Sequence, residues 1–281
     1  MTRARLLAAA LVLGALAWAA PQALDAVRTW RWAQGLLDSV APPKPGDAGP
    51  VACAGPGERP VVVLALGQSN AGNHGGLDER PARVRLFHDG HCLDATDPLP
   101  GSTGRGGSVW SLLPAALRDA GVARPVVVSA VGLDGTPIVA WTDRSSPLRW
   151  HLRAHLAAMR RAGVVPDAVL WQQGEGDAQR NTDPAAYRER LLALSTLLRD
   201  GGYHGPLLLA RSTRCRSQPH AALRQAVDDA AAQQPDRFAI GPDTDRLEGP
   251  ARLPDDCHLS AAGRAAAAQA WAQALAPRFG R

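Results

Sequence analysis

The chain has 281 residues, of which 46% are hydrophobic and 20% are charged, and its formal charge is +5. This length and composition suit one sizeable α/β domain plus a short extra segment, and they exclude a disordered chain. The basic residues are scattered along the sequence with no long run, so we expect no nucleic-acid partner.

The first 20 residues have the pattern of an export segment. Arg3 and Arg5 precede an apolar stretch from Leu6 to Ala20, and Ala17-Trp18-Ala19 has the small residues of a cleavage site. Residues 1–20 are therefore expected to be a signal peptide or, alternatively, an uncleaved membrane anchor. In either case we expect export, to the periplasm, to the exterior, or to a membrane-anchored position facing outward.

Residues 21–50 are predicted to form an amphipathic helix followed by a linker. Apolar residues recur there at about helical spacing: Leu24, Val27, Trp30, Ala33, Leu37 and Val40. Such a helix could continue an anchor or lie on the bilayer, which would associate the protein with the membrane through its N-terminal segment. Ala41 to Pro50 is rich in Pro and Gly, a composition that predicts a linker between this helix and the domain.

From residue 51 to residue 281 the pattern alternates and predicts a single domain. The strand-like runs are 61–66, 126–131, 166–171, 206–210 and 237–240. The helical segments are about 108–120, 148–162, 184–199, 217–233 and 259–276. A hairpin-like insertion at 84–93 lies between the first strand and the first long helix. The alternation predicts an α/β fold with a central parallel sheet of about five strands, covered by helices on both faces.

Gly67-Gln68-Ser69-Asn70 directly follows an unbroken aliphatic run, Val61 to Leu66, which is typical of a strand buried on both faces. Open α/β sheets place their chemistry at the carboxyl ends of such strands. Ser69 is therefore a candidate nucleophile, and the alternative is a turn with a serine that caps the next helix.

Two further strands are followed by polar, glycine-containing loops. Gly132-Leu133-Asp134-Gly135-Thr136 follows the run at 126–131, and Trp171-Gln172-Gln173-Gly174-Glu175 ends the run at 166–171. A backbone N–H at Gly135 and a side-chain amide at Gln173 could both donate to an oxyanion at the same sheet edge as Ser69.

A serine hydroxyl needs a base, usually a histidine that a carboxylate orients. Asp255 and His258 lie three residues apart on the loop that enters the last predicted helix, for which Ser260 is the expected N-cap. The side chain of the adjacent Asp256 is expected to leave the turn in another direction. The alternative is an ordinary acidic loop with a surface histidine.

Together these segments resemble the SGNH hydrolases, in particular the branch of sialate O-acetylesterase-like and plant carbohydrate esterases. The resemblance spans roughly residues 58–276 and is carried by Gly67-Gln68-Ser69-Asn70, Gly135-Thr136-x-Ile138, Trp171-x-Gln173-Gly174-Glu175-x-Asp177 and Asp255-x-x-His258. It implies a flavodoxin-like three-layer α/β/α fold and hydrolysis of an ester, often an acetyl group on a sugar.

The resemblance also implies residue roles. Ser69 would be the nucleophile, His258 the base and Asp255 its orienter. The Ser69 and Gly135 N–H groups and the Gln173 side chain would form the oxyanion hole, with Gly107 as an alternative donor. Gln68 and Asn70 replace the Asp and Leu of the broad family and, with Glu175, are expected to support the site. Pro137 stands where this branch more often has Ser.

The four cysteines fit an oxidising compartment and predict two disulfides, for which three pairings exist. We favour Cys53–Cys92 and Cys215–Cys257, because each would tie a loop beside the candidate site. The alternative is buried free thiols.

Other candidates have simpler interpretations. His151 and His155 have metal-compatible spacing but lack the adjacent Glu of a metalloprotease helix, so a solvated face is favoured. His74 lies on the loop surface or lines the pocket. Glu175 and Asp177 could be a glycosidase carboxylate pair, but loop bracing is favoured.

The sequence therefore predicts an exported or envelope-anchored serine esterase that removes O-acyl, in particular O-acetyl, groups from a carbohydrate or another small ester, with no metal and no cofactor. Two alternatives are a lipase or thioesterase of the same family and a non-catalytic polysaccharide-binding or assembly protein on the same scaffold.

Overall fold

The computed structural model describes residues 24–279, so the expected signal peptide or anchor at 1–20 lies outside the described residues. Within residues 24–279, eight strands form one sheet in the order β1-β4-β3-β5-β2-β6-β7-β8. Their bounds are β1 (Ala48–Val51), β2 (Val61–Gly67), β3 (Val84–His88), β4 (His91–Ala95), β5 (Val126–Gly132), β6 (Ala168–Gln172), β7 (Leu207–Arg211) and β8 (Phe238–Asp243).

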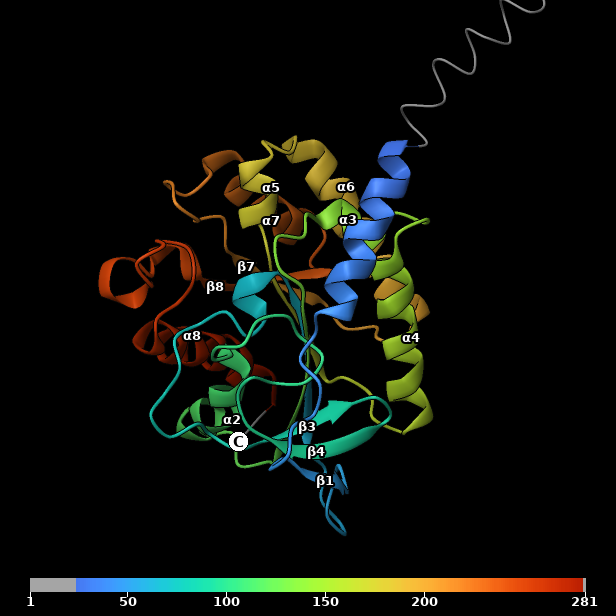
Figure 1. Ribbon diagram of the computed structural model, residues 1–281, viewed down its shortest axis with the longest axis vertical. Coiled ribbons are helices and arrows are strands. Elements are labelled where there is room, and N and C mark those ends of the chain that lie inside the picture. The colour runs from blue at the N-terminus through green and yellow to red at the C-terminus, as the bar shows by residue number, and fades with distance from the viewer. Residues whose placement is uncertain (1–23, 280–281) are drawn as a thin grey trace, which may run out of the picture.

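Helices cover the sheet on both sides, as Figure 1 shows. The longer ones are α2 (Val109–Asp119), α4 (Pro147–Arg161), α6 (Pro184–Asp200), α7 (Ala221–Gln233) and α8 (Ala261–Phe279). Two short helices, α3 (Ile138–Thr142) and α5 (Glu175–Gln179), lie in loops that follow strands. The chain has the expected α/β fold, and its arrangement is that of a flavodoxin-like α/β/α sandwich.

The aliphatic run of β2 is buried throughout because its side chains alternate between two cores. Val62, Leu64 and Leu66 belong to the core that contains α3, α4, α6 and α7. Val61, Val63 and Ala65 belong to the core that contains α2 and α8. The five expected parallel strands are all present and adjacent, in the order β5-β2-β6-β7-β8, with β8 at one edge of the sheet.

The sheet is wider than the predicted five strands because the hairpin and the linker region also join it. β3 pairs parallel with β5, β4 pairs antiparallel with β3, and β1 pairs antiparallel with β4. β1 lies partly inside 41–50, and the Ala41 backbone exchanges hydrogen bonds with Ser102 and Gly101. This segment is therefore packed on the domain rather than separating it from the preceding helix. Its Pro/Gly composition disfavours a helix but does not prevent strand pairing.

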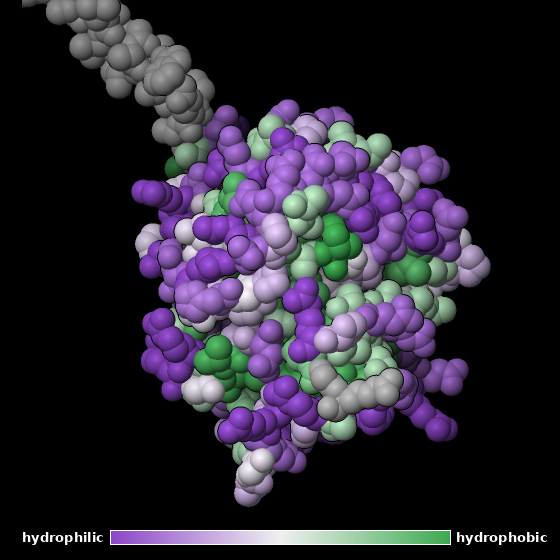
Figure 2. All heavy atoms as spheres, turned by 180° about the vertical axis from the view of Figure 1, so that it is seen from behind, coloured by the Kyte–Doolittle hydropathy of each residue, from purple (hydrophilic) through white to green (hydrophobic). Residues whose placement is uncertain are grey.

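The described part of the N-terminal segment is helical over residues 24–38. Ala33 is buried, and Leu37 packs against the same core. Leu24, Val27 and Trp30, which belong to the predicted apolar stripe, are instead exposed. No helix in the described part of the chain is long and apolar enough to cross a membrane. Viewed from behind, the surface is mostly polar with separated apolar patches (Figure 2).

Both expected disulfides, Cys53–Cys92 and Cys215–Cys257, are present. Cys215–Cys257 lies directly beside His258, as expected. Cys53–Cys92 instead joins the segment after β1 to β4 near one edge of the sheet, so the expectation that it ties a loop beside the site was wrong. That location follows from the widening of the sheet by the hairpin.

Candidate active site

Ser69 opens a short 3₁₀ helix, Ser69–Ala71, directly after β2, and it is 2% exposed. The tight exit from the strand depends on two glycines. A Cβ on Gly67, whose φ is +149°, would meet the Gln172 carbonyl oxygen at 2.0 Å, and a Cβ on Gly132 would meet the Ala71 backbone at 2.3 Å. Ser69 therefore lies at the carboxyl edge of the sheet, where the strand prediction placed it.

Asp255 and His258 form the predicted pair. His258 Nδ1 lies 2.6 Å from Asp255 Oδ2, and Asp255 Oδ1 accepts hydrogen bonds from the Cys257 and His258 N–H groups. Burial opposes ionisation of Asp255, but these hydrogen bonds hold the pKa of its carboxyl below the usual value. His258 Nε2 makes no hydrogen bond within residues 24–279, so its lone pair is available when Nδ1 carries the proton.

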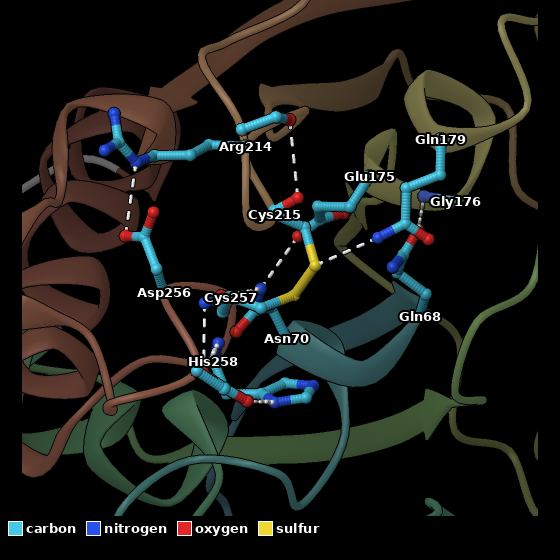
Figure 3. The surroundings of a disulfide bond; sticks show 12 residues. Gln68, Asn70, Glu175, Gly176, Gln179, Arg214, Cys215, Asp256, Cys257 and His258 are labelled. Carbon is cyan, nitrogen blue, oxygen red and sulfur yellow. Dashed lines mark hydrogen bonds and ion pairs between the residues drawn. A yellow bond between two sulfur atoms is a disulfide. The ribbon is translucent and has the colours of Figure 1, made fainter.

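Asp256 does not compete with Asp255. Its backbone has a φ of +49°, and its carboxylate points away toward Arg214, at 3.7 Å from Nε, as Figure 3 shows. The predicted divergence of the two aspartates is therefore present.

Asn70 joins the serine loop to the histidine loop (Figure 3). Its Nδ2 donates to the Cys257 carbonyl at 3.1 Å, and its Oδ1 accepts from the Leu259 N–H at 3.2 Å. These partners flank His258 on both sides. The residue after the candidate nucleophile thus fixes the backbone on either side of the candidate base.

The candidate oxyanion donors differ in their availability. Within the described residues, the N–H groups of Ser69 and Gly135 donate to no other group. The Gly107 N–H, by contrast, donates to the Gly75 carbonyl at 2.8 Å. This engagement disfavours Gly107 and leaves Ser69 and Gly135 as the backbone candidates.

Gln173 is oriented differently from the expectation. Its Nε2 donates to the Thr136 carbonyl at 3.0 Å and to Asp177 Oδ2 at 2.5 Å, which occupies both of its hydrogens. Its Oε1 accepts from the Tyr187 hydroxyl at 3.0 Å. In this arrangement Gln173 holds the 135–138 loop in place and directs no hydrogen toward an oxyanion.

Glu175 and Asp177 are both buried and are used as internal hydrogen-bond partners. Glu175 Oε1 accepts from Asn70 and from Ser212, and Asp177 accepts from the Ile138 N–H and from Thr182. These contacts match the bracing role that was favoured over a glycosidase pair. Burial raises the pKa of Glu175 to about 7, although the Asn70 hydrogen bond opposes this shift.

Gln68 completes the same network. Its Oε1 accepts from the Gly176 N–H at 2.8 Å. Its backbone N–H donates to the Gln172 carbonyl at 3.3 Å. The side chain therefore fastens the serine loop to the start of α5.

The other three histidines that the sequence analysis considered lie in two places. His155 is half-buried on α4 and lies 2.7 Å from Ser129 Oγ, and desolvation of its ring lowers its pKa to about 4. His151 stacks on His155, and no third metal ligand joins them within residues 24–279. Both histidines are half-buried, so the face that carries them is only partly solvated. His74 stacks on His258 at 5.2 Å between ring centroids, so it lies beside the candidate site.

Two buried arginines were missed by the sequence analysis. Arg252 donates to the Cys257 carbonyl and, through Nη2, to the Thr244 carbonyl at 2.9 Å, which supports the loop of His258. Arg264 on α8 pairs with Asp97 and Asp78. A charged residue within the apolar stripe of a helix, as at Arg264, is a sequence signal of a buried arginine. Its partners Asp97 and Asp78 could not be identified in this way, because they lie far from Arg264 in the sequence.

Comparison with known proteins gives a family match over most of the chain. The model of the carbohydrate esterase, sialic acid-specific acetylesterase family matches residues 60–277. No curated protein matches by sequence. A solved protein from Arabidopsis thaliana has a TM-score of 0.60 at 20% identity, over 79% of this chain and 100% of its own. A carbohydrate acetylesterase from Xanthomonas citri has a TM-score of 0.50 at 18% identity, over 76% and 55%. At these identities the structural matches establish similarity of fold.

Proposed function

Because the chain belongs to the sialic acid-specific acetylesterase family of carbohydrate esterases, and is a serine ester hydrolase, we propose that it removes O-acetyl groups from a carbohydrate with Ser69, His258 and Asp255 as its triad. One observation carries the assignment. The Asp255–His258 pair is joined at 2.6 Å, and Asn70, the neighbour of Ser69, bonds the residues on both sides of His258.

The proposed reaction uses the groups of the site that make no other hydrogen bond within the described residues, namely His258 Nε2 and the Ser69 and Gly135 N–H groups. Ser69 Oγ attacks the ester carbonyl carbon while His258 Nε2 takes its proton, and Asp255 stabilises the imidazolium. The carbonyl electron pair moves to oxygen, which the Ser69 and Gly135 N–H groups hold. Collapse of the tetrahedral intermediate expels the sugar oxygen, which receives the proton from His258. Water then attacks the acyl-enzyme by the same route and releases acetate.

The decisive experiment is acetate release from a panel of acetylated glycans by wild type and Ser69→Ala. We expect Ser69→Ala to lose at least about 10³-fold in kcat on p-nitrophenyl acetate while remaining folded. Ser145→Ala, an exposed serine outside the proposed triad, is the matched control and should retain full activity. Equal rates for Ser69→Ala and wild type would refute the triad.

The same panel tests the alternatives. Rates that rise with acyl-chain length would favour a lipase or thioesterase. Binding of a glycan without acetate release would favour a non-catalytic polysaccharide-binding protein.

We also propose that the protein is exported and stays close to a membrane. The two disulfides are typical of oxidising compartments. Leu24, Val27 and Trp30 present exposed apolar surface directly after the apolar N-terminal sequence. Cell fractionation combined with N-terminal sequencing distinguishes a cleaved signal peptide from a retained anchor.

A further inference from the structure

Three side chains beside the proposed triad form a cluster of metal-ligand type. His74, Asp134 and His258 each offer one ligand-capable atom, and these atoms all lie within 4.8 Å of one another. The two imidazole rings stack with an interplanar angle of 23°. We propose that this cluster binds a divalent transition-metal ion, with Zn²⁺ as the best match, and that the bound ion reversibly blocks the esterase.

The hydrogen bonds of His74 define which nitrogen is free. Its Nε2 lies 3.1 Å from Thr103 Oγ1. That hydroxyl donates its only hydrogen to the Gly132 carbonyl and accepts a hydrogen bond from the Asp134 N–H. The Thr103 oxygen is therefore an acceptor toward His74, so Nε2 carries the proton and Nδ1 keeps its lone pair.

His258 presents its lone pair in the same way. Because Nδ1 donates to Asp255, the lone pair is on Nε2. A carboxylate behind a metal-binding imidazole is a common arrangement, since it fixes the ring and raises the basicity of the ligand atom. The feature that makes His258 a base in the proposed reaction therefore also makes it a good metal ligand.

Asp134 supplies the negative charge. Its carboxylate is exposed and makes no hydrogen bond or ion pair within the described residues, while its backbone N–H is held by Thr103 at 2.9 Å. The same threonine thus holds two of the three candidate ligands.

Two imidazoles and one carboxylate match the donor set of zinc, whereas Ca²⁺ and Mg²⁺ prefer oxygen ligands. Tetrahedral zinc ligands lie about 3.3 Å apart, given bond lengths of about 2.0 Å. The three ligand atoms lie within 4.8 Å of one another, so metal binding requires them to move closer, and the exposed Asp134 side chain is free to move because it makes no hydrogen bond or ion pair within the described residues.

Occupancy has a direct consequence, which rests on the proposed function. A metal ion on His258 Nε2 takes the lone pair that would accept the proton of Ser69. The enzyme is then inactive until the ion leaves, and a chelator restores it. The ion is an inhibitor in this proposal and takes part in no step of ester hydrolysis.

Binding is tested on chelator-treated Ser69→Ala protein, so that the result does not depend on catalysis. Calorimetric titration with Zn²⁺ should show one equivalent bound, and Co²⁺ should give visible d–d absorption. Asp134→Asn and His74→Gln should each weaken binding by at least about 10-fold. His151→Gln, which alters a histidine outside the cluster, should leave binding unchanged.

Inhibition is tested on protein that retains Ser69 and is therefore able to hydrolyse the ester. Zn²⁺ should inhibit the metal-free wild type, EDTA should restore its rate, and Asp134→Asn should need at least about 10-fold more Zn²⁺ to lose half of its own metal-free rate. The proposal is overturned if no Zn²⁺ binds, or if Asp134→Asn and His74→Gln bind and respond as the wild type does. Absence of hydrolysis by the metal-free wild type would refute the proposed function instead. It would leave the metal site to be decided by the titration of Ser69→Ala protein, which does not depend on catalysis.

Discussion

Asn70 uses both ends of its amide to hold the loop of His258, so its contribution to activity can be separated from its contribution to stability. Asn70→Ala would leave the Leu259 N–H without its partner and the Cys257 carbonyl with Arg252 as its remaining side-chain donor. A shift of the base by about 1 Å can lower the rate by about 10²-fold. We expect Asn70→Ala to lower kcat on p-nitrophenyl acetate by roughly that factor, with little change in KM.

Asn73→Ala provides the matched control for this substitution. Asn73 is buried like Asn70 and also makes three hydrogen bonds, but its partners are Leu99 and Ser102. Both variants should lose stability, by about 1–3 kcal/mol for each buried group left unpaired. If Asn73→Ala loses as much kcat as Asn70→Ala, the positioning role of Asn70 is wrong.

Glu175 gives the molecule a predictable dependence of stability on pH. Burial raises its folded-state pKa to about 7, above the value of 4.5 expected in the unfolded chain. Below pH 4.5 both states hold the proton, and between pH 4.5 and 7 only the folded state keeps it. The free energy of unfolding therefore falls as the pH rises through this window, by about 3 kcal/mol in all, because the stabilisation from the bound proton is lost.

Urea unfolding at pH 5 and pH 8 measures this effect. The wild type should lose up to about 3 kcal/mol between the two values relative to Glu175→Gln, because glutamine is neutral at both. Glu189→Gln, an exposed glutamate on α6, should follow the wild type. Parallel pH profiles for wild type and Glu175→Gln would contradict the prediction.

At the scale of elements, the sequence predicted what depends on local pattern. The run of β2 is apolar at every position and that of β5 at every position except Ser129, and the structure buries both strands on both faces. By contrast, α3 and α5 have five residues each, too few for a helical period to be recognised. The direction of the Gln173 amide could not be predicted either, because its partner Thr136 lies 37 residues away in the sequence.

The two disulfides allow the effect on the site to be separated from the effect on stability. They have sequence separations of 39 and 42 residues, so loop closure predicts nearly equal stabilisation, about 4 kcal/mol each. Removing Cys215–Cys257 by paired Cys→Ser substitution frees the residue next to His258 and should lower kcat. Removing Cys53–Cys92 should cost similar stability, measured by urea unfolding, and leave kcat unchanged below the unfolding transition. Equal losses of kcat would contradict a positioning role for Cys215–Cys257.

At the scale of the whole molecule, the exposed apolar residues of the N-terminal segment lie beside the loop that follows β5. A groove of about 520 Å³ is lined by Val27, Trp30 and Trp32 from the N-terminal helix and by Pro137 and Val139 from the other side. Pro137 lies two residues after Gly135, the proposed oxyanion donor. A membrane that receives the N-terminal helix would therefore lie close to the proposed active site.

Vesicle binding tests this arrangement. The chain from residue 21 onward should sediment with phosphatidylglycerol-containing vesicles, and Trp30→Ser should weaken the partition by about 10-fold, because burying a large apolar side chain contributes about 1.5–3 kcal/mol. Trp150→Ser is the control, since Trp150 on α4 is 55% exposed and Trp30 is 51% exposed. Equal partition of the two variants would show that exposed tryptophan acts without regard to its position. Partition of Trp30→Ser equal to that of the wild type would exclude the helix as the membrane-facing element.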